Sequence, residues 1–196
     1  MDTTAAAVPP ERLEAGDVVL RRWRMDDAPL LLRAIADNLD HLRPYMPWAG
    51  QPPTTESVDA YLRLHARAFE PRREAGYAIV APGDDSEIRG GCSLHDQQRP
   101  GIVSLGYWVH RDHLRRGHAT AAARVLTATA FTLPGIQRVE IHCDETNAAS
   151  AAVPRRLGFR LDGVVFRAAL APAETGRDMV WVMDRPAWAA EPQPSA

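Results

Sequence analysis

The chain has no lysine and only two cysteines, and each of these features excludes some reactions of the side chains. All 23 basic residues are arginine, so no side-chain amine is available for self-acylation. Cys92 and Cys143 lie in apolar, strand-like stretches, which favours buried thiols over a disulfide or a reactive pair and fits a reducing cytoplasm. A net charge of −2 gives no overall basic field, which argues against nucleic acid as the main partner.

Long hydrophobic runs are also missing. No apolar run approaches the roughly 18 residues that a membrane helix needs, and the N-terminus lacks the basic region and apolar core of a signal peptide. We therefore expect a cytoplasmic protein with no membrane partner. The 196 residues, 45% of them hydrophobic, suit one domain at 13–188, with flexible tails at 1–12 and 189–196.

The order of periodic segments predicts an α+β fold. Strands are predicted at 17–23, 76–81, 87–94, 102–109, 137–143, 159–166 and 177–183. Helices are predicted from Asp26 or Asp27 to Ala36, and at 55–69, 117–131 and 150–157. Pro154 fits the last of these helices only if that helix starts late, because proline breaks a helix interior.

One strand, loop and helix dominate the middle of the chain. The strand ends at Val109, residues 110–116 are polar and basic, and an alanine-rich helix begins near Gly117. Helix N-termini carry unpaired N–H groups and partial positive charge, so this loop favours a phosphate or pyrophosphate. Arg115 and Arg116 strengthen that field. The alternative is an ordinary helix start with a solvated basic loop.

The run Arg115-Arg116-Gly117-His118-Ala119-Thr120, with the later Asn147-Ala-Ala-Ser150 and Leu157-Gly158-Phe159, resembles the GNAT acyltransferase superfamily. More narrowly it resembles the RimJ/RimL branch, from Val18 to about Trp188. The resemblance implies a mixed, mostly antiparallel sheet of six to seven strands, with splayed central strands and about four flanking helices. It also implies acetyl-CoA as co-substrate, no metal, and a homodimer.

The resemblance places coenzyme A on the loop and helix start. The residues expected to bind it are Val109, Leu114, Arg115, Arg116, Gly117, His118, Ala119, Thr120 and Asn147. Leu114 stands where the family has Gln or Arg, which removes one side-chain contact but leaves the main-chain amides. The pantetheine arm would pair with the exposed edge of the preceding strand, and the N–H of Val109 is the candidate oxyanion donor. For Asn147, the alternative is an Asx-turn.

Ser150 falls where the RimL branch has a serine proposed to protonate the departing thiolate. The alternative is an N-cap, because a serine between a loop and a helix is a common cap. The branch has a glutamate on the following strand, where this chain has Ala169, so the base is unassigned. Glu140 is the nearest candidate, although it could equally be a solvated charge. His142 and His118 could titrate near neutrality, but isolated histidines are more often structural.

Two further groups of residues have both a functional and a structural explanation. Tyr45, Met46 and Trp48 resemble a segment that walls the acceptor pocket in RimL-like proteins, although aromatic segments often pack in cores. His110, Asp112 and His113 are of residue types that bind metals, but adjacent loop residues rarely converge and no further ligand spacing completes a site. We expect no metal.

The expected function is N-acyl transfer from acetyl-CoA to a primary amine by direct attack in a ternary complex. The acceptor would be a protein or peptide N-terminus, or a small-molecule amine. The alternatives are another donor such as succinyl-CoA, and a GNAT-like acyl-CoA sensor without turnover, because the family glutamate is missing. A dinucleotide-binding oxidoreductase is disfavoured, because the loop lacks the three-glycine fingerprint.

Overall fold

The computed structural model describes residues 8–66 and 75–190. Its strands form one sheet of eight, in the order β1-β2-β3-β4-β5-β6-β8-β7. The bounds are β1 Arg12–Ala15, β2 Val18–Arg22, β3 Ala75–Val80, β4 Gly90–Asp96, β5 Ile102–Val109, β6 Arg138–Asp144, β7 Arg160–Phe166 and β8 Arg177–Asp184. Neighbouring strands are antiparallel except β5 and β6, which run parallel.

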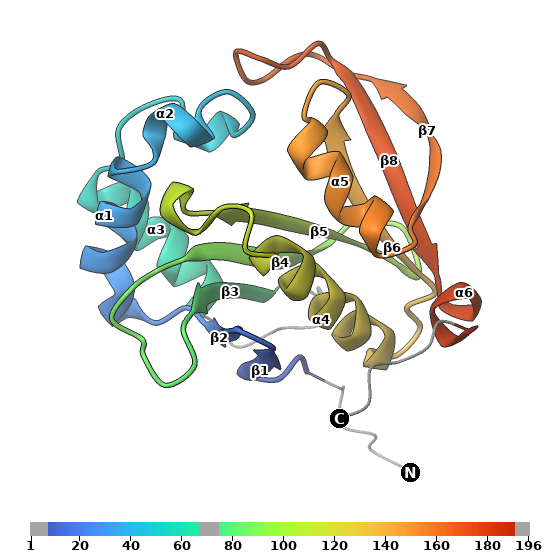
Figure 1. Ribbon diagram of the computed structural model, residues 1–196, viewed down its shortest axis with the longest axis horizontal. Coiled ribbons are helices and arrows are strands. Elements are labelled where there is room, and N and C mark those ends of the chain that lie inside the picture. The colour runs from blue at the N-terminus through green and yellow to red at the C-terminus, as the bar shows by residue number, and fades with distance from the viewer. Residues whose placement is uncertain (1–7, 67–74, 191–196) are drawn as a thin grey trace.

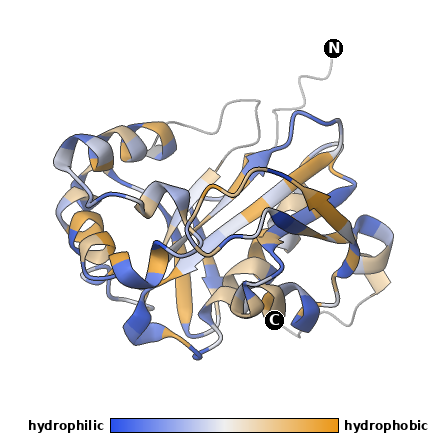
Figure 2. Cartoon of the chain, turned by 90° about the horizontal axis from the view of Figure 1, so that it is seen from above, coloured by the Kyte–Doolittle hydropathy of each residue, from blue (hydrophilic) through white to orange (hydrophobic). Residues whose placement is uncertain are grey.

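Helices cover both faces of the sheet (Figure 1). They are α1 Ala28–Ala36, α2 Leu39–Leu42, α3 Thr55–Ala66, α4 His118–Thr132, α5 Ala148–Arg156 and α6 Arg185–Ala190. One core cluster joins α4 and α5 to one face, and a second joins α1 and α3 to the other. Because both faces are covered, β3 is buried along its whole length, and Figure 2 shows hydrophobic stretches on the strands between the helical layers.

The predicted α+β class and the mostly antiparallel sheet are confirmed, but the element counts were low. The sheet has eight strands and not six or seven, because β1 is an edge strand of only four residues, which is too short to be predicted from its sequence pattern. Helices α2 and α6 span only four and six residues, which is too short for a periodic pattern. The predicted end of the second helix, at 67–69, lies outside the described residues.

Both predicted tails are partly ordered. The Tyr77 hydroxyl donates to the Pro10 carbonyl at 2.8 Å, and the Arg22 amide donates to the Glu11 carbonyl at 2.8 Å. At the other end α6 continues to Ala190. Residues 1–7 and 191–196 lie outside the described part. Within the described ranges, no helix is both long and apolar enough to cross a membrane.

Candidate active site

A cleft of about 850 Å³ opens where β5 and β6 separate. The parallel ladder starts at the pair Ile102 and Arg138 and stops at Leu105 and Ile141. Beyond that point β5 continues to Val109 and pairs only with β4. The splayed central strands expected from the family are therefore present, and one edge of β5 faces the cleft.

The alternation of a strand determines which amides face this gap. His110 N–H donates to the Arg89 carbonyl beside β4 at 2.8 Å. Successive residues of a strand point their N–H groups to opposite sides, so the amides of Tyr107 and Val109 point away from β4 and toward the gap. The Val109 N–H therefore points toward the gap between β5 and β6, although Val109 itself is not among the residues that line the cleft.

Helix α4 begins with an open, unblocked terminus. Gly117 is its N-cap residue with φ +82°, and a Cβ built there meets no atom within 4 Å. The first amides of a helix have no acceptor within the helix, and no side chain caps these. Arg115 and Arg116 are exposed beside them. The predicted anion-binding residues 114–120 are therefore brought together around one positively polarised helix end.

His118 contributes main chain but not an exposed side chain. The ring is buried and stacks on His113 with centroids 5.9 Å apart. Burial, together with the charge of Arg89, lowers the pKa of His118, so the ring is neutral near pH 7. Among the described residues, no group of histidine, cysteine, aspartate or glutamate has the arrangement of a metal site, and His110, Asp112 and His113 do not form one.

The start of α5 corrects two sequence-based expectations. Asn147 is the N-cap, and its Oδ1 accepts from the Ser150 amide at 3.0 Å. The alternative in which Ser150 caps the helix is therefore wrong: Ser150 is the third helical residue, and its hydroxyl is free of capping. The helix also starts early, at Ala148, so Pro154 lies inside it. Asn147 and Ser150 both line the cleft.

The aromatic segment predicted to wall an acceptor pocket lines the same cleft. Trp48 is 50% exposed and meets Trp108 edge to face at 6.1 Å. The Tyr45 hydroxyl donates to the Thr146 carbonyl at 3.1 Å, which ties this segment to the loop before α5. With Met46 also at the wall, these residues are cleft residues and not core residues.

The floor of the cleft holds a polar pair that the sequence did not reveal. Ser93 Oγ lies 2.7 Å from His95 Nε2 on β4, and both residues line the cleft. A Cβ at Gly106 would come within 3.2 Å of His95 Nε2 and 3.3 Å of Ser93 Oγ. The glycine keeps this floor open. A serine hydroxyl bonded to an imidazole nitrogen can pass a proton to it.

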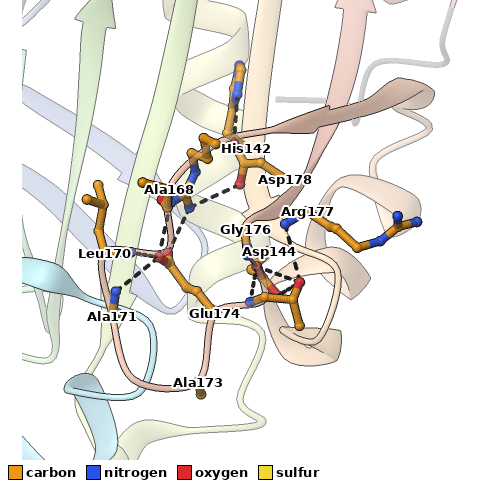
Figure 3. A network of polar contacts seen from close by, with 12 residues as sticks. His142, Asp144, Ala168, Leu170, Ala171, Ala173, Glu174, Gly176, Arg177 and Asp178 are labelled. Atoms are coloured by element: carbon orange, nitrogen blue, oxygen red, sulfur yellow. Dashed lines mark hydrogen bonds and ion pairs between the residues drawn. The ribbon is translucent and has the colours of Figure 1, made fainter.

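One buried carboxylate, Asp144, lines the cleft and joins two loops (Figure 3). Asp144 accepts hydrogen bonds from the amides and hydroxyls of Thr146 and Thr175 and from the Gly176 amide. Burial alone raises the pKa of Asp144, but these bonds outweigh burial and hold it well below its usual range. Asp144 therefore joins the loop before α5 to the loop between β7 and β8.

The loop between β7 and β8 carries charged side chains that are already paired. Glu174 accepts from Arg167 at 2.7 and 3.0 Å, which lowers the pKa of Glu174. Asp178 contacts Arg167 and His142. Ala169, at the family's glutamate position, is exposed on this loop. Glu174 lies only five residues further on, yet Arg167 and two amides occupy its oxygens and make it a poor base.

Glu140, the sequence-based candidate for the base, does not reach the cleft. It is 2% exposed, it is not among the residues that line the cleft, and its Oε2 contacts both Arg99 and His142. His142 does line the cleft, but its two ring nitrogens face Asp178 and Glu140. The hydrogen bond to Asp178, with help from Glu140, raises the pKa of His142. The ring therefore tends to hold its proton.

Comparison with known proteins agrees with this geometry. The family model described as an acetyltransferase (GNAT) domain matches residues 17–160. The chain belongs to the GNAT acetyltransferase family. Against YdaF of Bacillus subtilis (strain 168), provisionally named a ribosomal N-acetyltransferase, it is 30% identical over 149 residues, which cover 74% of this chain and 79% of YdaF. The match to YjdG of the same organism, named an uncharacterized N-acetyltransferase, spans only 51% of YjdG.

Solved structures share the fold of this GNAT chain. RimJ of Mycobacterium smegmatis, solved in complex with CoA-disulfide, has a TM-score of 0.75 at 25% identity and covers 92% of this chain and 86% of its own. RimL, the ribosomal L7/L12 alpha-N-protein acetyltransferase solved with coenzyme A, has a TM-score of 0.78 at 20% identity and covers 92% and 99%.

Proposed function

We propose that this GNAT protein transfers an acetyl group from acetyl-CoA to the α-amino group of a protein or peptide. The observation that carries this proposal is the free edge of β5 beside the open N-terminus of α4. That pair of features fits the donor: an extended amide arm can pair with Tyr107 and Val109, and a diphosphate can sit on the amides after Gly117.

The chemistry follows from the groups around the gap. The N–H of Val109 would stabilise the oxyanion formed when the amine attacks the thioester carbonyl. The new C–N bond forms, the C–S bond breaks, and the Ser150 hydroxyl protonates the departing sulfur. Transfer would be direct, because neither thiol suits a nucleophile. Burial raises the pKa of Cys92 and raises that of Cys143 to about 11.

The attacking amine must also lose a proton. We assign its acceptor to the pair Ser93 and His95, in place of Glu140, because this pair lies on the open floor of the cleft. The amine would give its proton to Ser93 Oγ as the serine passes its own to His95 Nε2. Starting from the neutral amine, Ser150 regains a proton and His95 releases one through solvent, so these steps have no net proton change. An amine that arrives as the ammonium form first releases one further proton.

Two observations support an α-amine as the acceptor. RimL is named as an alpha-N-protein acetyltransferase. An α-amino group has a pKa of about 7.7–8.0, against about 10.4 for a lysine side chain, so a weak base deprotonates it more easily. A small-molecule amine of similar pKa is the competing acceptor. The aromatic wall formed by Tyr45, Met46 and Trp48 would hold the residues next to that amine.

The proposal includes a cytoplasmic location and a homodimer. Both cysteines are free and buried, which accords with a reducing cytoplasm. The homodimer rests on the resemblance to the family alone, and light scattering at micromolar concentration tests it. Neither nucleic acid nor a membrane is expected as a partner.

Thiol release tests the proposal. Acetyl-CoA is offered with peptides that have a free α-amine, with matched peptides that have a blocked terminus and one lysine, and with small amines. We expect release of CoA, and peptide acetylation by mass spectrometry, with the free α-amine. Tight acetyl-CoA binding without release for any amine would favour the sensor. Faster turnover with succinyl-CoA would reassign the donor.

A further inference from the structure

Pro154 leaves one main-chain acceptor of α5 without its usual donor. In an α-helix the carbonyl of one residue accepts from the N–H four residues later, so the Ser150 carbonyl would pair with residue 154. Proline has no N–H to offer. Because main-chain acceptors in a folded protein are generally paired, the Ser150 carbonyl needs a donor from outside the helix.

Tyr107 supplies that donor from β5. Its hydroxyl lies 3.1 Å from the Ser150 carbonyl oxygen and 3.3 Å from Ser150 Oγ. Both residues line the cleft. Burial raises the pKa of Tyr107, with the bond to Ser150 opposing the shift, so the hydroxyl keeps its proton and remains a donor.

We propose that Tyr107 is a positioning residue for Ser150, made possible by Pro154. The phenol donates its single proton to the Ser150 carbonyl, and the same oxygen lies 3.3 Å from Ser150 Oγ, where it restricts the positions that the serine hydroxyl can take. One hydroxyl thereby fixes both the first turn of α5 and the serine that protonates the CoA sulfur. This assignment rests on the proposed function and deepens it. It also links the strand that faces the thioester with the helix that carries the acid.

The decisive variant is Tyr107→Phe, which removes one oxygen and keeps the ring. We expect the single-turnover rate of CoA release to fall about tenfold or more, because small displacements of a catalytic group are costly. The dissociation constant for acetyl-CoA should stay within about twofold, since the amides of β5 are unchanged. Ser150→Ala should lose at least as much rate, and Tyr107→Phe added to Ser150→Ala should cost less than a further twofold.

Two controls separate positioning from stability. Tyr77→Phe also removes a tyrosine hydroxyl that donates to a main-chain carbonyl, at Pro10, and its rate should stay within about twofold of the wild type. Pro154→Ala, combined with Tyr107→Phe, gives the Ser150 carbonyl a helical N–H. Compared with Tyr107→Phe alone, the double variant should regain melting temperature, but its rate of CoA release should stay low.

Any one of these results would overturn the assignment: an unchanged rate in Tyr107→Phe, independent multiplicative losses in the double variant with Ser150→Ala, or recovery of the rate by Pro154→Ala. Failure of the proposed function is distinguishable, because then the wild type itself releases no CoA with any amine. If Ser150→Ala alone retains full rate, Tyr107 cannot act through Ser150 and the assignment also fails.

Discussion

The two halves of the proposed active site, one for the donor and one for the acceptor, are built from different parts of the polypeptide. The proposed donor half is mainly backbone, namely the free edge of β5, which faces the cleft, and the first amides of α4, which are not among the residues that line it. The proposed acceptor half is mainly side chains that line the cleft, which come from the segment around Trp48, from β4 and from the loop between β7 and β8. Main-chain amides can bind the same donor whatever the neighbouring side chains are. A pocket lined by side chains can change its acceptor specificity with each substitution. The substitutions below test each half on its own, and the last of them tests an ion pair at the edge of the site.

The largest effect is expected from Gly117→Glu, which breaks the donor half. The substitution puts a negative charge where the diphosphate is expected, and like charges in contact cost several kcal/mol, which corresponds to about a 100-fold or greater loss of affinity. The fold should persist, because a Cβ at Gly117 meets no atom within 4 Å. The side chains of the acceptor half are not changed. Calorimetric titration with acetyl-CoA measures the loss.

Gly83→Glu is the matched control for that variant. Gly83 also has a left-handed φ, +74°, with no atom within 4 Å of a built Cβ, but it lies in the turn between β3 and β4. It should suffer the same backbone strain and keep its affinity. An equal loss in both variants would mean that strain, and not charge at the helix start, explains the effect.

Asp144→Asn loosens the acceptor half. The change removes the charge that five donor groups share, and losing hydrogen bonds to a buried carboxylate should lower the free energy of unfolding by about 2 kcal/mol. The exposed turn residue Asp84 is the control, and Asp84→Asn should cost less than about 0.5 kcal/mol. Urea denaturation compares them. Equal costs would remove Asp144 as the fastener of the two loops.

Trp48→Ala should affect the acceptor and spare the donor. The loss of an exposed aromatic wall should raise KM for the peptide about tenfold while KM for acetyl-CoA stays within about twofold. Phe166→Ala, at a residue 78% exposed on β7 and outside the cleft, should change neither constant. A rise in both KM values for Trp48→Ala would show that the two halves are not separate.

The smallest effect concerns the pH dependence of stability. The pKa of His142 is raised in the folded protein by Asp178 and Glu140. Its contribution is therefore complete below pH 6.5 and is lost as pH rises through the folded pKa. The urea midpoint of His142→Gln should fall furthest below that of the wild type near pH 5.5. The two midpoints should converge as the pH rises toward 9. A constant gap across that range would contradict the ion-pair account.

The strand end at Val109 and the helix start at Gly117, where the donor is proposed to bind, could be predicted from sequence because their signals are local. A strand, a basic loop and Gly117 at the start of an alanine-rich helix occupy consecutive residues, and backbone geometry follows from that order. The free N–H of Val109 needed one further fact, the pairing of His110 with Arg89, which only the structure supplies.

Of the side chains assigned to the proposed acceptor half, only Tyr45, Met46 and Trp48 were predicted from sequence, and the structure places these three in the lining of the cleft. Ser93 and His95 became recognisable as a pair only once β4 was placed beside Gly106 in the cleft. Glu140 was misleading because a charged residue on a strand next to the cleft can be buried in an ion pair beneath it. Pro154 was expected to delay the start of α5, but an acceptor can find its donor across space, in this case at Tyr107.

Amide hydrogen exchange measured with and without saturating acetyl-CoA tests the central claim most directly. The amides of Tyr107, Val109 and Ala119 should exchange more slowly when acetyl-CoA is bound, because the donor's arm and diphosphate would accept from them. The amide of His110, already bonded to Arg89, should change little and serves as the internal reference. Unchanged exchange at Tyr107 and Val109 under saturation would contradict a donor site made of main chain.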